Sequence, residues 1–250
     1  MRRLVAVVTT MTCGAMLGCT ANGGPFNVSG ISDGGSPSTF PNDGSTPSTI
    51  LDGQGGPTLP GKFFCDAGAR ALGPNPTTEV GSNGLVGGPL TDLLNSVGGT
   101  TVTTLLNSVK DKDLAIDSIL PTFSTFSLTA GGLGALNSVD QIVDLDATNP
   151  AGNYAVFAVT FPAGTLAASI VNAVSVTTYL GDAQQETMTF DQTALQLLGA
   201  VNTGPTRAFL GLKTHKDYSR AAIDLTPSVL SADVGDAMHV NELCTAGHFE

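Results

Sequence analysis

Short runs of alternating apolar and polar residues, each ended by Gly, Pro, Asn or Asp, constrain the fold of this chain more than any other feature. They recur through its last three quarters. A side-chain period of two between turn residues is typical of β-strands. The clearest run is 154–161, and Gly181-Asp182 joins two further runs in a hairpin pattern. We predict eight strands, at 123–129, 141–145, 154–161, 174–180, 186–190, 207–212, 221–225 and 238–243.

Many short strands separated by turn signals predict an all-β fold, an antiparallel β-sandwich or jelly roll over residues 62–250. The composition agrees with this fold class. Charged residues make up 12% of the chain and there are 31 glycines, which is too little charge and too much glycine for a coiled coil or a helical bundle.

The charge balance excludes one class of partner. The chain has 10 Lys and Arg against 21 Asp and Glu, for a formal charge of −11. A site for phosphate backbones needs a basic face, which so few cations can hardly build. We therefore expect no nucleic-acid partner.

The N-terminus has the features of an export signal. Arg2 and Arg3 precede an uncharged apolar stretch that is too short to span a membrane. Met16-Leu17-Gly18-Cys19 then resembles the bacterial lipobox, with Met where Leu is usual. We predict that residues 1–18 are a lipoprotein signal peptide and that Cys19 is lipidated. The protein would then be anchored in the cell envelope, at the outer membrane or cell surface, with the membrane as its partner. The alternative is ordinary secretory cleavage nearby, with Cys19 incidental.

Low-complexity sequence follows this signal. Of the 41 residues from 20 to 60, 26 are Gly, Pro, Ser or Thr, and none is Lys or Arg. Such a segment cannot bury enough apolar surface to offset the entropy lost on ordering. We predict a flexible tether over residues 19–61.

Two cysteines remain once the signal region is set aside. Cys13 lies in the excised segment and Cys19 is the lipidation site, which leaves Cys65 and Cys244 near the two ends of the domain. An even remainder in an oxidising compartment predicts a disulfide. Sandwiches often begin and end on neighbouring strands, which would bring the two thiols together.

A short repeat interrupts the strand pattern. The sequence Leu-Leu-Asn-Ser-Val occurs at 93–97 and again at 105–109. Two copies are too few for a solenoid. We expect a loop or short helical excursion that packs its Leu pairs on the sandwich, and the alternative is a protruding loop that faces a ligand.

Several short motifs resemble the discoidin-like, galactose-binding-like jelly rolls of bacterial surface proteins. They are 107–109, 114–117, 122–128, 177–181, 218–225 and 240–244. The resemblance covers about residues 65 to 244 and implies a jelly-roll sandwich. The chain has no Trp and lacks the basic loop residues that many discoidin domains display, so a sugar or phospholipid ligand does not follow from the resemblance.

One acidic cluster suggests a metal ion. Asp111, Asp113 and Asp117 lie close together, where galactose-binding-like folds often carry calcium, and calcium takes six to eight oxygen ligands. Lys112 inside the cluster argues against this site, and Asp117 has the alternative role of capping a turn. Apart from calcium, we expect no cofactor.

These features favour a non-catalytic function. We predict a surface lipoprotein, not an enzyme, whose β-sandwich binds an extracellular glycan or a matrix or envelope protein, or supports envelope structure. One alternative is a hydrolase acting on envelope or extracellular polymer. Another is a secreted structural subunit that self-associates through exposed strand edges.

Overall fold

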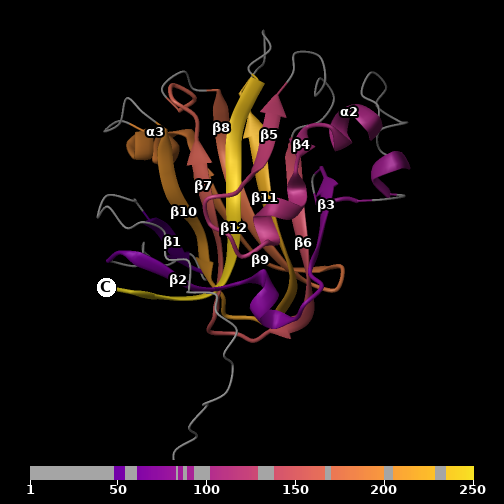
Figure 1. Ribbon diagram of the computed structural model, residues 1–250, viewed down its shortest axis with the longest axis vertical. Helices are drawn as coiled ribbons and strands as arrows, with labels where there is room; N and C mark the ends of the chain where they lie inside the picture. Colours follow the sequence, from indigo (N-terminus) through magenta and orange to yellow (C-terminus); the bar gives the residue numbers. More distant parts are fainter. Residues whose placement is uncertain are drawn as a thin grey trace, which may run out of the picture. The chain divides into compact units, whose positions relative to one another are not determined.

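Two β-sheets packed face to face form the domain in the computed structural model (Figure 1). The residues described are 48–53, 61–82, 84–86, 89–92, 102–128, 138–166, 170–199, 205–228 and 235–250. The first sheet holds β1 (Ser48–Asp52), β10 (Thr206–Lys213), β7 (Tyr154–Phe161), β12 (Gly235–Phe249), β5 (Ser124–Leu128) and β4 (Val109–Lys110), in this order, and β2 (Phe63–Gly68) also pairs with β12. The second holds β3 (Thr77–Gly81), β6 (Val139–Asn149), β11 (Tyr218–Pro227), β8 (Val171–Leu180) and β9 (Ala183–Asp191).

The last eight strands have the connectivity of a jelly roll. Numbered from one at β5 to eight at β12, they run 1-8-3-6 in the first sheet and 2-7-4-5 in the second. Each step along the chain changes sheet, except for the β8–β9 hairpin. This order confirms the predicted antiparallel jelly-roll sandwich. All eight predicted strands are present, and Gly181 takes a φ of +59° in the predicted hairpin turn.

The main core lies between the two sheets. Alternate residues of each strand point inward, and Phe157 of β7, Phe126 of β5 and Ile223 of β11 are each fully buried there. Gln141 is a buried polar side chain that forms hydrogen bonds in two directions. Its amide oxygen accepts a hydrogen bond from the Ser124 hydroxyl at 2.6 Å, and its amide nitrogen donates to the Lys112 carbonyl at 2.7 Å. A buried amide therefore has partners on both sides, as the desolvated interior requires.

A second apolar cluster lies on the outer face of the first sheet and corrects the expected tether boundary. β1 falls within the predicted tether, yet it pairs in parallel with β10, and Ile50 is fully buried. Ile50 packs in a cluster with Phe63, Phe209 and Val156. The sandwich thus includes residues 48–52, because the apolar side chain of Ile50 packs against the apolar residues on this face of the sheet.

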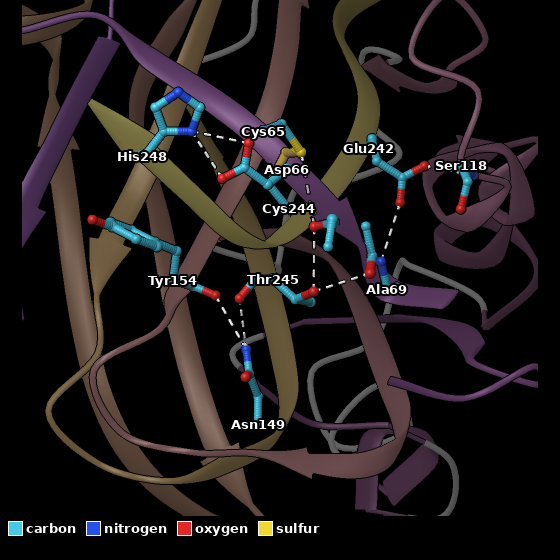
Figure 2. Close-up of a disulfide and its surroundings, with 12 residues drawn as sticks. Cys65, Asp66, Ala69, Ser118, Asn149, Tyr154, Glu242, Cys244, Thr245 and His248 are labelled. Carbon is cyan, nitrogen blue, oxygen red and sulfur yellow. Dashed lines mark hydrogen bonds and ion pairs between the residues drawn. A yellow bond between two sulfur atoms is a disulfide. The ribbon is translucent and has the colours of Figure 1, made fainter. Parts of the chain in front are cut away.

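The domain ends are joined as predicted. β2 pairs antiparallel with the end of β12, and Cys65 and Cys244 form a disulfide across the pair (Figure 2). Lys62 and Glu250 exchange two backbone hydrogen bonds of 2.9 and 3.0 Å beyond it. Closing a loop with a sequence separation of 179 stabilises the fold by about 4 to 5 kcal/mol in the chain-entropy model.

Four short helices are also described. The 3₁₀-helices η1 (Ala69–Leu72) and η2 (Lys112–Ile116) follow β2 and β4, and α3 (Gln192–Gly199) follows β9. The helix α2 (Val102–Leu106) precedes β4 and carries part of the second Leu-Leu copy. Leu105 is fully buried, whereas Leu106 is 47% exposed. The expected packing of the Leu pair on the sandwich therefore holds for only one of the two side chains, and the first copy, at 93–97, lies outside the described residues.

Candidate functional site

A groove runs along one edge of the sandwich. It lies between β3, the edge strand of the second sheet, and β4, the edge strand of the first sheet. We call it the edge groove, and its volume is about 580 Å³. Its lining comes from β3, α2, β4 and the start of η2, which Figure 1 shows together at one side of the domain. The lining residues are Thr78, Glu79, Val80, Leu106, Val109, Asp111, Lys112 and Asp113. The volume falls within the range of small-ligand sites.

Short edge elements position these side chains. Among the described strands, β3 pairs with β6 alone and β4 pairs with β5 alone, so each sheet ends beside the groove. Asp111 takes a left-handed backbone conformation, with φ +52°, and turns the chain from β4 into η2. Asp tolerates this conformation better than most residues. The hydrogen bond from Gln141 to the Lys112 carbonyl then ties η2 to the core.

A three-residue polar network lies in the groove. The Lys112 ammonium donates to the Thr78 carbonyl at 2.7 Å, to the Thr78 hydroxyl at 3.2 Å and to a carboxylate oxygen of Asp113 at 3.1 Å. The Thr78 hydroxyl donates to the same Asp113 oxygen at 2.7 Å. The bond from Thr78, and then that from Lys112, lowers the pKa of the Asp113 carboxyl. Asp113 is therefore ionised at neutral pH and accepts hydrogen bonds.

An aliphatic surface faces the same groove. Leu106 is the most exposed of its apolar side chains, while Val80 and Val109 are 5% and 4% exposed. The groove thus combines an apolar wall with fixed hydrogen-bonding groups. A ligand with one apolar face and several hydroxyl groups can use both surfaces at once.

The structure separates the three aspartates predicted to bind calcium. Asp111 and Asp113 line the edge groove, where Asp113 is engaged by Lys112 and Thr78. Asp117 accepts hydrogen bonds from the Ile119 amide and the Thr122 hydroxyl, each at 2.8 Å, so it caps a turn before β5. In the described ranges, no group of three or more His, Cys, Asp or Glu side chains is arranged to hold a metal ion. The Asp113 and Asp117 carboxylates thus accept hydrogen bonds from different partners.

Two other carboxyl groups have raised pKa values, but neither lines the groove. Burial raises the pKa of Glu242 to about 8, although the Ser118 and Ala69 amides donate to it at 2.8 and 3.4 Å (Figure 2). Burial and then its neighbour Asp224 raise the pKa of Asp140 on the second sheet, where Gly84 and Ser138 donate to it. Both groups are enclosed by their partners and hold chain segments together.

The groove residues that the sequence did not indicate come from distant positions. Thr78 lies 35 residues before Asp113, and nothing local links them. Lys112 counts in the sequence only as an argument against calcium, yet it organises the network. Leu106 belongs to the repeat for which a ligand-facing loop is one interpretation, and it does line the groove.

The predicted lipidation site lies outside the described residues, as do the rest of residues 1–47. Among the helices that are described, none is long and apolar enough to cross a membrane.

Comparison with known proteins finds no matching family model and no significantly similar curated sequence. One similar solved structure is CBM28, a carbohydrate-binding module specific for non-crystalline cellulose; the TM-score is 0.32 and the identity 10%, covering 49% of this chain and 72% of that chain. Another is CBM32-3 from a family 31 glycoside hydrolase of Clostridium perfringens; the TM-score is 0.30 and the identity 15%, covering 55% of this chain and 82% of that chain. Because both TM-scores are low, the fold assignment rests on the strand order of this chain.

Proposed function

We propose that the protein is a lipid-anchored component of the bacterial cell envelope, and that its β-sandwich binds a neutral extracellular glycan in the edge groove without cleaving it. The observation that carries the proposal is the groove itself, in which the exposed Leu106 side chain faces the fixed network of Lys112, Thr78 and Asp113.

The envelope location is supported by two independent features. Met16-Leu17-Gly18-Cys19 resembles a lipobox after a basic and then apolar N-terminus. The Cys65–Cys244 disulfide is of the kind that persists in oxidising compartments. Loss of Arg2 and Arg3 with the signal peptide would take the formal charge from −11 to −13, so attachment to anionic lipids would depend on acyl chains instead of basic residues.

The charges of the groove favour a neutral ligand. Glu79, Asp111 and Asp113 supply three carboxylates, whereas Lys112 is the single cation of the lining and already has partners there. Carboxylates accept hydrogen bonds from sugar hydroxyls, and the apolar face of a pyranose ring can pack on Leu106. An acidic glycan would be repelled by the same carboxylates.

The protonation states of the groove favour binding over hydrolysis. Glycosidases use a carboxyl group with a raised pKa as the general acid, paired with a second carboxylate across the scissile bond. Asp113 has a lowered pKa, so it is a poor proton donor at neutral pH. The two carboxyls with strongly raised pKa values, Asp140 and Glu242, lie outside the groove and are only 1% and 2% exposed.

The binding proposal is tested with the purified full-length protein on an array of neutral oligosaccharides, followed by calorimetry on the tightest ligand. We expect Leu106→Ala and Asp111→Asn each to weaken binding about tenfold, which corresponds to about 1.4 kcal/mol. Leu197→Ala is the matched control, because Leu197 is 70% exposed on α3 and does not line the groove. Failure of every neutral glycan to bind, or release of new reducing ends from the ligand, would contradict the proposal.

The anchor is tested separately with Cys19→Ser in cells. We expect the variant to leave the membrane fraction for the soluble fraction while its domain remains folded, because the described helices offer no membrane span. If the variant stayed with membranes through a high-salt wash, the lipid anchor would be wrong.

A further inference from the structure

Five side chains from distant positions in the sequence form a line across the outer face of the first sheet. The strand register pairs Lys110 with Thr125, Thr125 with His239, His239 with Thr160, and Thr160 with Arg207. These residues come from β4, β5, β12, β7 and β10, which follow one another in the sheet (Figure 1). We call this line the transverse row. With neighbouring strands about 4.8 Å apart, its four steps span about 19 Å.

The row faces solvent because its sequence neighbours face the core. Each member is exposed or partly exposed, and the residues on either side of it along the strand are buried wherever they belong to the sheet. In β10, for example, Arg207 is exposed between the buried Thr206 and Ala208. The cluster that buries Ile50 and Phe63 covers another part of this face and includes none of the row.

An aromatic ring lies beside the middle of the row. Phe123 is 39% exposed and stacks on His239, with ring centroids 4.1 Å apart and planes inclined by 8°. Asn241 fixes the segment that carries Phe123: its amide nitrogen donates to the Leu120 and Thr122 carbonyls at 3.1 and 3.2 Å. The Thr160 hydroxyl donates to the Asn241 amide oxygen at 3.0 Å. The ring is therefore held in place before any ligand arrives, which reduces the entropy lost on binding.

The positive charge of the row lies at its two ends. Within the part of the chain that the structure describes, neither Lys110 nor Arg207 forms an ion pair. Burial lowers the pKa of His239, whose Nε2 has no hydrogen-bond partner among the described residues, so the ring is neutral at neutral pH. Asp236 is the nearby acid, 3.9 Å from that ring, and it also accepts a hydrogen bond from Ser127.

This arrangement fits an extended ligand with carboxylates near both ends. Lys110 and Arg207 place one positive charge at each end of the row, about 19 Å apart. Threonine hydroxyls between them can bond to hydroxyl groups, and the Phe123 ring offers a flat surface for a sugar ring. We propose that the transverse row binds a linear acidic oligosaccharide made of uronic acids. The row shares no residue with the edge groove, and the proposal goes beyond the function of that groove.

The test uses tetragalacturonate as the probe and its fully methyl-esterified form as the uncharged partner. Calorimetry with the purified full-length protein should detect binding of the acid and at least tenfold weaker binding of the ester. Arg207→Gln and Phe123→Ala should each weaken binding of the acid about tenfold or more, the fold-change expected when one charge-assisted hydrogen bond or one stacking contact is lost. Higher salt should weaken binding of the wild-type protein, because the charges at the row are exposed.

Two controls separate this site from other causes. Lys216→Gln removes the same charge beyond the far end of β10 and should leave affinity unchanged, and so should the groove variant Leu106→Ala. Phe123→Leu keeps an apolar side chain without the ring and should also weaken binding, with its melting temperature measured alongside. The proposal is wrong if tetragalacturonate does not bind, if the ester binds equally well, or if Lys216→Gln weakens binding as much as Arg207→Gln. A groove that failed to bind neutral glycans would leave these outcomes unchanged.

Discussion

The region around the disulfide and the edge groove both contain polar side chains, but these side chains have opposite roles. Around the disulfide, Glu242, Asn149 and Thr245 are each at most 4% exposed, and all have partners within the chain (Figure 2). We call this region, with Cys65 and Cys244, the clasp. In the groove, the Lys112 and Asp113 side chains are 39% and 77% exposed. Polar groups in the clasp therefore hold the fold together, whereas those in the groove are exposed to solvent and can contact a ligand.

The clasp joins segments from both ends of the domain. Glu242 accepts hydrogen bonds from amides after β2 and after η2, and Thr245 donates to the Gly68 carbonyl at 3.0 Å. Asn149, at the end of β6, donates to the Thr245 carbonyl at 2.9 Å and to the Tyr218 hydroxyl at 2.8 Å. Each contact bridges residues far apart in sequence, so the clasp carries much of the long-range order. Substitutions there should change stability more than binding.

The largest expected effect is loss of the disulfide. Replacing Cys65 and Cys244 with Ser should lower the free energy of unfolding by about 4 to 5 kcal/mol. For a domain of this size, the melting temperature should fall by more than about 10 °C. Thermal unfolding of the oxidised, reduced and doubly substituted proteins measures this, and peptide mapping without reductant checks the pairing. If the reduced and the oxidised protein had the same melting temperature, the stability of the clasp would not depend on the disulfide.

The second effect is a pH dependence from Glu242. Its pKa is raised from 4.5 to about 8, so between these values the folded state binds a proton that the unfolded state has released. This contribution to stability is complete below about pH 4.5 and is lost as pH rises through 8, with a slope of up to about 1.4 kcal/mol per pH unit. Glu242→Gln does not titrate, so urea unfolding from pH 5 to 8 should show the wild type losing stability relative to this variant. Parallel pH profiles would contradict the shift.

The third effect tests a neutral part of the clasp. Asn149→Ala removes the donor to the buried Thr245 carbonyl and should cost about 1 to 3 kcal/mol, the penalty of a buried group left without a partner. Chemical unfolding measures the loss at any pH, since no charge changes. Asn153→Ala is the control, because within the described part of the chain the Asn153 side chain donates to the Asn149 side chain alone, and Asn153 is less buried. Equal losses for the two variants would remove the distinction between the clasp and its surroundings.

The jelly-roll strands and the disulfide of the clasp are predictable from sequence, whereas the polar contacts of the clasp and of the groove are not. The strands of the jelly roll are predicted by the local alternation of apolar and polar residues, and the disulfide by the number of cysteines and the compartment. Both predictions need no knowledge of which distant residues are neighbours in the fold. β1 was missed because Ile50 stands in a segment rich in Gly, Pro, Ser and Thr. The groove was missed because its network joins Thr78 to Lys112 and Asp113 across two sheets, and only the fold makes those residues neighbours.

The smallest expected change in stability is that of a substitution in the edge groove. Asp113→Asn breaks an exposed ion pair, and such pairs contribute about 0.2 to 1 kcal/mol, so the melting temperature should move by only a few degrees at most. The same change removes a carboxylate acceptor from the edge groove and should weaken neutral-glycan binding about tenfold. Asp182→Asn is the matched control, because it also breaks an exposed ion pair, with Arg220 at 3.5 Å in the β8–β9 turn; it should cost as little stability and leave glycan binding unchanged. Calorimetry and thermal unfolding on the same samples measure both properties. If Asp113→Asn bound the glycan normally but lost as much stability as Asn149→Ala, Asp113 would have a structural role, like the clasp residues, and no role in ligand binding.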